Sequence, residues 1–212
     1  MIAIINYGAG NLRSVQKSFQ RYYPNTVISN DLETLCQSFA IVVPGVGSFG
    51  KAIEELEQLE LLNPLKEILS TKMVLGICLG MQLFFDKSEE SPESTGLSLI
   101  KGEVRKFLEV DEIKIPHIGW NKVITNFVSN NINNFSNIYA YFNHSYYCQP
   151  LNTEVICANS LHGVFFPSII RKSNIFATQF HPEKSGSLGE QVIQWFICEV
   201  NKKRCYNDNS CY

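Results

Sequence analysis

The stretch Met73–Gln82, MVLGICLGMQ, decides how this chain folds. Its first half is a run of apolar residues, typical of a strand that is buried on both faces of a sheet. The run leads into Cys78, which lies between Gly76 and Gly80, and glycines at this spacing permit a sharp turn from a strand into a helix. The next residues, Met81–Phe85, are expected to be helical. We therefore predict a strand–turn–helix unit that lifts the Cys78 side chain out of the sheet.

Strands and helices alternate before this unit. Short apolar runs at Ala3–Ile5, Val27–Ile28 and Ala40–Val43 predict strands, and apolar residues at helical spacing follow the first and third of them, beginning near Asn11 and Ser48. Such a βαβα rhythm predicts a mostly parallel sheet covered by helices on both faces. The predicted fold class is therefore α/β.

The pattern changes beyond Lys87. The polar loop Ser88–Gly96 is followed by short strand-like segments and by an Asn/Ser-rich surface connection at Asn126–Asn137. These segments are Val104–Leu108, Trp120–Ile124, Tyr139–Phe142, Val155–Ala158 and Phe176–Gln179. A final amphipathic helix, Gly189–Lys203, closes the fold. We find no repeat and no linker, so we expect one domain with a mixed sheet over residues 1–203 and a frayed tail over 204–212.

The composition argues against several classes of protein. The chain has 212 residues, 45% of them apolar and 18% charged, which suits one domain with a sizeable core. The formal net charge is −2 without a long Lys/Arg run, so we expect no nucleic-acid partner. A basic leader and an apolar run of about 20 residues are both absent, so we expect no membrane partner and a cytoplasmic location. The seven cysteines are irregularly spaced, which predicts neither a disulfide framework nor a metal site.

Cys78 has the surroundings of a nucleophile. The N-terminus of the following helix favours the thiolate, and the Leu79 N–H can point at a developing oxyanion. A thiolate requires a proton carrier, and His181 comes directly after an apolar strand, with Glu183 two residues further on. Side chains at i and i+2 of an extended chain project to the same side, so the carboxylate can hold the imidazole in one tautomer. By itself the segment His181–Glu183 also fits a plain turn; with the elbow it predicts a catalytic triad.

The other histidines lack a following acid. His117 and His144 are expected to bind or to pack, and His162, beside Gly163, to lie in an exposed turn. The loop Pro44–Ser48, PGVGS, lies where a backbone N–H can reach an anion, which makes Gly47 a candidate second oxyanion donor. The same loop also fits a simple strand–helix turn.

Two rival functions have some support in the sequence. Gly8-Ala9-Gly10 follows a strand and opens a helix, and Asp31 lies where a ribose-binding acid of a nucleotide site would be. The third glycine position of that motif is Arg13, however, which hinders close approach of a pyrophosphate. A free-standing cysteine hydrolase is the other rival, and cleavage of a peptide or ester by the chain alone would distinguish it.

The segments Gly76–Gln82 and Gln179–Glu183 together resemble the class I (triad) glutamine amidotransferases. Further segments narrow the resemblance to glutaminase subunits of histidine biosynthesis, namely Asn6–Asn11, Pro44–Gly50, Pro116–Asn121, His144–Tyr147 and Lys184–Gly186. The resemblance extends from Met1 to about Lys203, so it covers almost the whole chain.

The resemblance implies a seven-stranded, mostly parallel sheet and an amidotransferase without a cofactor. Cys78 would attack the side-chain amide of L-glutamine to give a γ-glutamyl thioester, His181 would protonate the departing ammonia and activate water, and Glu183 would orient His181. Gly47 and Leu79 would supply the oxyanion N–H groups. Family positions around the glutamine correspond to Gln82, His144, Ser145 and Tyr146.

The resemblance also implies a partner. A (β/α)8-barrel cyclase would form a heterodimer with this chain and use the ammonia to make imidazole glycerol phosphate and an aminoimidazole carboxamide ribonucleotide. Positions that face the cyclase correspond to Asn11, Trp120, Asn121 and Lys184. Asn143, where the family pattern has an apolar residue, and the Cys-containing tail depart from that pattern. They leave open the alternative of a paralogue that supplies ammonia to a sugar or glycan amidotransferase.

Overall fold

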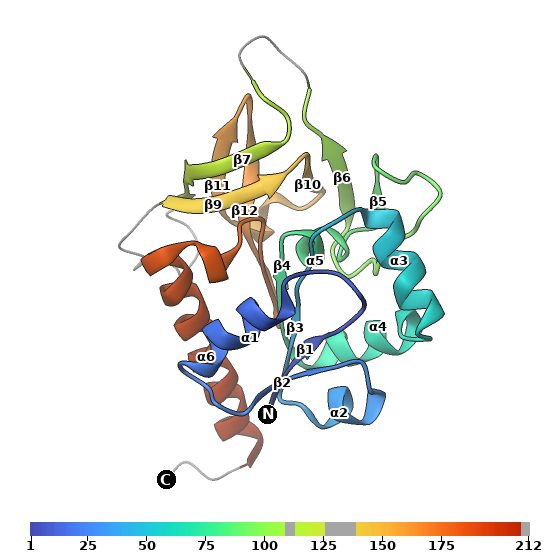
Figure 1. Ribbon diagram of the computed structural model, residues 1–212, viewed down its shortest axis with the longest axis vertical. Coiled ribbons are helices and arrows are strands. Elements are labelled where there is room, and N and C mark those ends of the chain that lie inside the picture. The colour runs from blue at the N-terminus through green and yellow to red at the C-terminus, as the bar shows by residue number, and fades with distance from the viewer. Residues whose placement is uncertain (109–112, 126–138, 209–212) are drawn as a thin grey trace.

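A computed structural model describes residues 1–108, 113–125 and 139–208 (Figure 1). The main sheet has eight strands in the order β2-β1-β3-β4-β13-β12-β11-β8. Their bounds are β1 Ile2–Ile5, β2 Thr26–Ser29, β3 Ala40–Val43, β4 Met73–Ile77, β8 Ile124–Thr125, β11 Ile156–His162, β12 Val164–Lys172 and β13 Ile175–Thr178. The first five strands of that order pair in parallel, and the other three pair antiparallel. The prediction of a mixed, mostly parallel sheet is confirmed, with eight strands in place of seven.

Helices cover both faces of the sheet because its strands are apolar on both sides. In β1, Ala3 and Ile5 pack into one core and Ile2 and Ile4 into the other, as alternation along a strand requires. The first core lies under α2 Leu32–Gln37, α3 Phe49–Gln58, α4 Leu62–Thr71 and the short α5 Leu79–Gln82. The second lies under α1 Leu12–Gln20 and α6 Gly186–Asp208, on the opposite side in Figure 1.

Two small sheets extend the upper end of the molecule in Figure 1. One contains β5 Lys87–Ser88, β6 Gly102–Lys106 and β10 Tyr146–Pro150; the other pairs β7 His117–Lys122 with β9 Tyr139–His144. Short 3-10 turns, η1 Thr153–Val155 and η2 Pro182–Lys184, precede β11 and α6. The polar connection predicted at Asn126–Asn137 lies outside the described residues.

Several local expectations differ from the structure. The helix after Cys78 is α5, which begins at Leu79 and not at Met81. Helix α6 continues through Arg204 to Asp208 and so includes the start of the segment that we expected to fray, while residues 209–212 are outside the description. Asp31, considered above as a ribose-binding acid, caps α2, since its Oδ2 accepts hydrogen bonds from the Thr34 N–H and hydroxyl at 2.8 and 2.7 Å.

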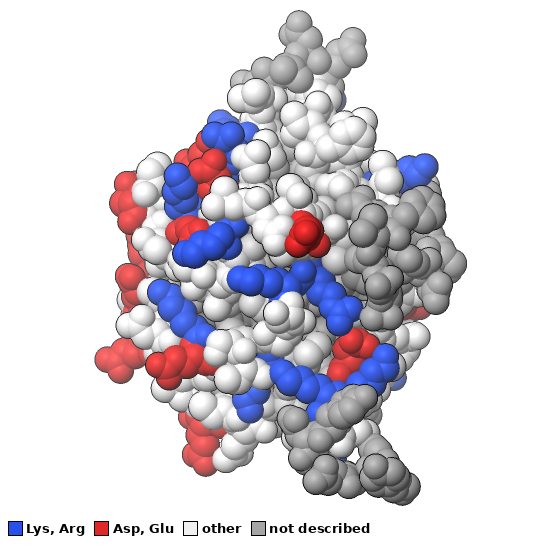
Figure 2. All heavy atoms as spheres, turned by 180° about the vertical axis from the view of Figure 1, so that it is seen from behind, with Lys and Arg blue, Asp and Glu red and all other residues white. Residues whose placement is uncertain are grey.

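Charged side chains of both signs share the surface. Figure 2 shows Lys and Arg lying among Asp and Glu on the face turned away from the viewer in Figure 1. The ion pairs of the described residues include Lys101–Asp86 (2.9 Å) and Lys87–Glu103 (3.1 Å). Among the described residues, no helix has the length and apolar character needed to cross a membrane.

Candidate active site

Cys78 occupies a sharp turn between β4 and α5. Its φ of 53° and ψ of −107° are unusual for a residue with a side chain, and the sulfur-bearing residue is only 4% exposed. The turn requires a glycine at position 80, because a Cβ there would lie 1.8 Å from the Val43 carbonyl oxygen of the neighbouring strand β3. The predicted elbow is confirmed as a structural feature, with helix α5 starting directly behind the thiol.

Parallel pairing of β4 with β13 brings His181 to Cys78. The two strands end together at Ile77 and Thr178, and the Cys78 N–H donates to the Thr178 carbonyl at 2.7 Å. His181 follows three residues later in the chain. The two residues therefore meet at one edge of the sheet although they are far apart in sequence.

Glu183 contacts His181 through a tight turn. His181 Nδ1 lies 2.9 Å from Glu183 Oε1, and both side chains are buried. We expected an extended chain at this point; the structure instead has the 3-10 turn η2, which begins at Pro182. The predicted proximity is correct, and the predicted backbone route is wrong because Pro182 favours the start of a helical turn.

The environment of His181 favours its protonated form. Burial opposes the charge, but the negative charge of the Cys78 thiolate and the contact with Glu183 outweigh it and raise the pKa of His181 to about 10. The buried Nε2 atom of His181 has no hydrogen-bond partner in the described part of the chain. At neutral pH His181 is therefore protonated.

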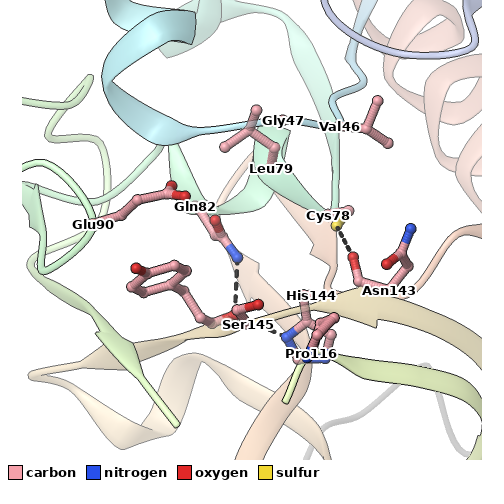
Figure 3. Close-up of a pocket in the computed structure, with 11 residues that line it drawn as sticks. Val46, Gly47, Cys78, Leu79, Gln82, Glu90, Pro116, Asn143, His144 and Ser145 are labelled. Carbon is pink, nitrogen blue, oxygen red and sulfur yellow. Dashed lines mark hydrogen bonds between the residues drawn. The ribbon is translucent and has the colours of Figure 1, made fainter.

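A cavity of about 240 Å³ opens beside the thiol (Figure 3). Its lining includes Cys78, the two predicted oxyanion residues Gly47 and Leu79, and all four predicted glutamine-binding residues, Gln82, His144, Ser145 and Tyr146. It also includes Val46, Glu90, Pro116 and Asn143. Gly47 has a φ of 114°, in the region that favours glycine, and lies in an exposed part of the loop.

His144 belongs to a buried hydrogen-bond chain under this cavity. Its Nδ1 lies 2.8 Å from the Tyr146 carbonyl oxygen, which can only accept, so Nδ1 carries the proton. Its Nε2 therefore accepts from His117 Nδ1 at 3.0 Å, and His117 Nε2 accepts from the Asn121 amide at 3.1 Å. Burial lowers the pKa of His144 to about 3 and that of His117 to about 4, so both rings are neutral. Both ring nitrogens of His144 are thus occupied within the protein.

His162 extends this group of rings. Its imidazole stacks on that of His117 with centroids 4.1 Å apart, and its Nε2 lies 2.9 Å from the Lys114 carbonyl oxygen. His162 ends strand β11 and is half-buried, so the expectation of an exposed turn residue is wrong. Among the described residues, no group of three or more His, Cys, Asp or Glu side chains is arranged to hold a metal ion.

Two of the four predicted interface residues line a cavity that also contacts the triad. A second cavity of about 220 Å³ is lined by Asn11 and Lys184 together with His181 and Glu183, and it shares Val46 and Asn143 with the first cavity. Trp120, on β7, is 59% exposed. Asn121 contributes its amide to the histidine chain and to the Leu161 carbonyl at 2.9 Å.

Comparisons with known proteins agree with this geometry. The family described as glutamine amidotransferase class-I matches residues 3–200. The chain is 44% identical over 208 residues to "Imidazole glycerol phosphate synthase subunit HisH 1" of Methanococcus maripaludis, covering 93% of this chain and 98% of the relative. It is 45% identical over 201 residues to the HisH subunit of Methanocaldococcus jannaschii, with the same coverage. The chain belongs to the class-I glutamine amidotransferases, and within them to the HisH family.

Solved structures agree on the fold of this amidotransferase. A crystal structure of a glutamine amidotransferase superposes with a TM-score of 0.74 and 15% identity, covering 95% of this chain and 100% of the other. At that identity the likeness concerns the fold alone.

Two residues of the amidotransferase site were not singled out from the sequence. Glu90, in the loop that we described only as polar, lines the cavity beside Cys78 and accepts a hydrogen bond from the Phe49 N–H at 2.7 Å, at the start of α3. Gln179 was quoted only as part of the motif around His181, yet its amide reaches the Cys78 sulfur at 3.6 Å. Neither contact can be seen from sequence spacing, because each joins segments that are distant along the chain.

Proposed function

We propose that this chain is the glutaminase subunit of an imidazole glycerol phosphate synthase, which hydrolyses L-glutamine to glutamate and ammonia in histidine biosynthesis. The observation that carries the proposal is the buried Cys78–His181–Glu183 cluster beside a cavity of glutamine size, in a chain 44–45% identical to HisH subunits over 93% of its length. The cytoplasmic location expected from the sequence stays a prediction.

The reaction begins with the Cys78 thiolate. It attacks the side-chain amide carbon of glutamine, and the resulting oxyanion accepts hydrogen bonds from the Leu79 and Gly47 N–H groups. His181, which holds a proton at neutral pH, donates it to the departing ammonia, so that a γ-glutamyl thioester remains. His181 then takes a proton from water, which hydrolyses the thioester and regenerates the thiolate. Glu183 accepts the His181 Nδ1–H throughout and keeps Nε2 available for these transfers.

The cavity suits the rest of the glutamine molecule. Glu90 gives it a carboxylate for the α-ammonium group, while the described residues of the lining include neither Lys nor Arg. Ser145 and Tyr146 lie at the same wall, where polar groups can receive the α-carboxylate. His144 has no free ring nitrogen, so we assign it a role in shaping the wall.

The partner we propose is a (β/α)8-barrel cyclase that forms a heterodimer with this chain. The cavity lined by Asn11 and Lys184 also contacts His181 and Glu183, and we propose it as the route by which ammonia leaves. Lys184 and the exposed Trp120 both pack near the Tyr141 ring, beside this route. Loss of ammonia to solvent is avoided if this route is covered by the enzyme that consumes the ammonia.

Replacement of Cys78 by Ser tests the proposal. A serine alkoxide is far harder to form than a thiolate near neutral pH, so glutamine-dependent synthesis by the complex should be abolished. Synthesis supported by added ammonium salt should persist, because only ammonia generation is lost. Loss of both activities would show that Cys78 is structural.

Growth of a histidine auxotroph separates the main proposal from the glycan alternative. The strain would lack its own glutaminase subunit and carry this gene together with a cyclase. Growth without histidine is expected with the natural sequence and not with Cys78→Ser. A failure of the natural sequence to support growth, with both proteins present, would favour a paralogue that serves another amidotransferase.

A further inference from the structure

Gln179 is a fully buried polar residue that the reaction described above does not use. It lies directly after β13, and its side chain is absent from the lining of the glutamine cavity. Its Nε2 atom lies 3.6 Å from the Cys78 sulfur, on the protein side of the nucleophile. Burial of an amide costs free energy unless the amide makes hydrogen bonds, so the hydrogen-bond partners of Gln179 indicate its role.

The surrounding hydrogen bonds determine which way the amide points. The Tyr146 carbonyl oxygen can only accept, so the Gln82 atom 3.0 Å from it is the amide nitrogen. The same nitrogen lies 3.4 Å from Gln179 and therefore faces the Gln179 oxygen. The nitrogen of Gln179 is then directed at the Cys78 sulfur. A backbone carbonyl thus fixes the orientation of both amides.

The two hydrogen bonds of the sulfur belong to different protonation states. A thiol can donate to the Asn143 carbonyl, which lies 3.8 Å away, whereas a thiolate cannot donate at all. The hydrogen bond from the Gln179 N–H, in contrast, becomes stronger when the sulfur is negative, because hydrogen bonds to ionised groups are stronger than those to neutral groups. Ionisation of Cys78 therefore exchanges one contact for the other, and Gln179 favours the ionised form.

We propose that Gln179 is a further catalytic residue of this glutaminase, whose amide N–H holds the Cys78 thiolate in place, and that Gln82 acts as a positioning residue by fixing the orientation of that amide. The inference rests on the proposed function, since Gln179 is assigned to stabilise Cys78, the nucleophile of the proposed reaction. It adds a donor that acts before glutamine binds, unlike the oxyanion N–H groups, which act on the transition state.

The test measures alkylation of Cys78 by iodoacetamide as a function of pH in the isolated full chain. Only the thiolate reacts rapidly, so the midpoint of the rate profile follows its formation. Because the chain has seven cysteines, the Cys78 peptide would be followed by mass spectrometry. Gln179→Met has a similar volume and no donor, and it should move the midpoint upward by about one pH unit, which corresponds to a hydrogen bond at the weak end for an ionised group.

The matched control is Ser168→Ala. Ser168 is equally buried, and its carbonyl accepts the Gln179 backbone N–H at 3.0 Å, but its hydroxyl has no hydrogen-bond partner among the described residues. This variant should keep the natural midpoint. A Gln179→Met midpoint equal to that of the natural chain would overturn the inference, and so would an equal upward shift in Ser168→Ala.

Gln82→Met provides a second, independent variant if Gln179→Met does not fold. Without the Gln82 donor the Gln179 amide is free to turn, so a smaller upward shift is expected, and an unchanged midpoint would contradict the inference. Complete resistance of Cys78 to alkylation at every pH would instead argue against Cys78 as a nucleophile, which is a failure of the proposed function itself.

Discussion

At Cys78, backbone geometry and chemistry depend on one another. A residue with positive φ is strained, typically at a cost on the order of 1–3 kcal/mol, and such strain persists only where the surrounding structure enforces it. Here the close approach of Gly80 to β3 and the hydrogen bond from the Cys78 N–H to Thr178 enforce it. The result is a thiol at a helix N-terminus with His181 beside it, which is the arrangement that a thiolate nucleophile requires.

Glu183→Gln tests the proposed role of the carboxylate at the residue scale. We expect a decrease in glutaminase rate at or below the 10²–10⁴-fold range found for loss of general acid–base catalysis, since Gln can still accept from His181 Nδ1. Glu183 helps to raise the pKa of His181 to about 10, so its loss should move the alkaline limb of the kcat/KM profile to lower pH. A decrease in rate with an unmoved alkaline limb would indicate a structural role instead.

Among the elements, the β7–β9 pair joins the predicted interface to the active site. Six residue pairs connect the two strands, from His117 opposite His144 to Lys122 opposite Tyr139. The chain Asn121–His117–His144 runs along this pair and ends at the Tyr146 carbonyl, which also accepts from Gln82. A displacement of β7 by a bound partner would therefore reach the wall of the cavity beside Cys78.

The neutral histidines of these strands predict an acid-sensitive fold. The pKa of His144, about 3, and that of His117, about 4, lie below 6.5, so between pH 6.5 and 4 the unfolded chain binds more protons than the folded chain. The contribution of these two neutral histidines to the free energy of unfolding should be fully present above pH 6.5 and should be lost as the pH falls below it. For buried His144 the loss is on the order of 3 kcal/mol across that window, as one pKa unit corresponds to about 1.4 kcal/mol.

His144→Gln, which cannot be protonated in this range, should flatten the pH dependence. Urea unfolding of both proteins at pH 7.5 and pH 4.5 measures the effect. The variant is expected to be less stable by about 1 kcal/mol at pH 7.5 because its hydrogen bonds are altered. If the free energy of unfolding of the variant fell between pH 7.5 and pH 4.5 by as much as that of the natural chain, the assignment of His144 as buried and neutral would be contradicted.

Elements with a strong local pattern could be predicted from the sequence, and those stabilised by distant contacts could not. The apolar runs of β1, β3 and β4 and the start of α1 near Asn11 were predicted correctly. Strand β12 was missed because it contains Pro167, which lies beside an irregularity in the pairing with β11, where a missing N–H is tolerated. The site followed the same rule, since Cys78, His181 and Glu183 have local motifs, whereas Glu90 and Gln179 act through tertiary contacts.

At the scale of the whole molecule, two cavities adjoin each other at the triad. The cavity beside Cys78 and the cavity lined by Asn11 and Lys184 share Val46 and Asn143, so the loop that carries Gly47 borders both cavities. Asn143 is exposed there, with its carbonyl near the Cys78 sulfur. Asn143, where the family pattern has an apolar residue, therefore lines the cavity that we propose as the ammonia route.

This position of the loop predicts that the isolated chain is a poor glutaminase and that the cyclase with its nucleotide ligand activates it. Glycines in the Gly45–Gly47 segment allow a peptide plane to flip at little steric cost. With the Gly47 N–H turned away, one oxyanion donor is missing, which costs about 10²–10³-fold in rate. A partner that binds more tightly when the Gly47 N–H points toward the oxyanion would restore this donor. Partner binding and glutamine hydrolysis would then be allosterically coupled. Steady-state rates would be compared for the chain alone, with cyclase, and with cyclase plus ligand.

Two variants at Gly47 make this prediction specific to the N–H group. Gly47→Pro has no N–H and should hold the complex near the basal rate even with ligand bound. Gly47→Ala keeps the N–H, and its Cβ would meet no atom of the other described residues within 4 Å, so it should retain more of the activation than Pro despite the strain of a positive φ. Equal activation of the Pro variant and the natural chain would exclude Gly47 as the switched donor. A fully active isolated chain would remove the need for a switch and favour a free-standing hydrolase.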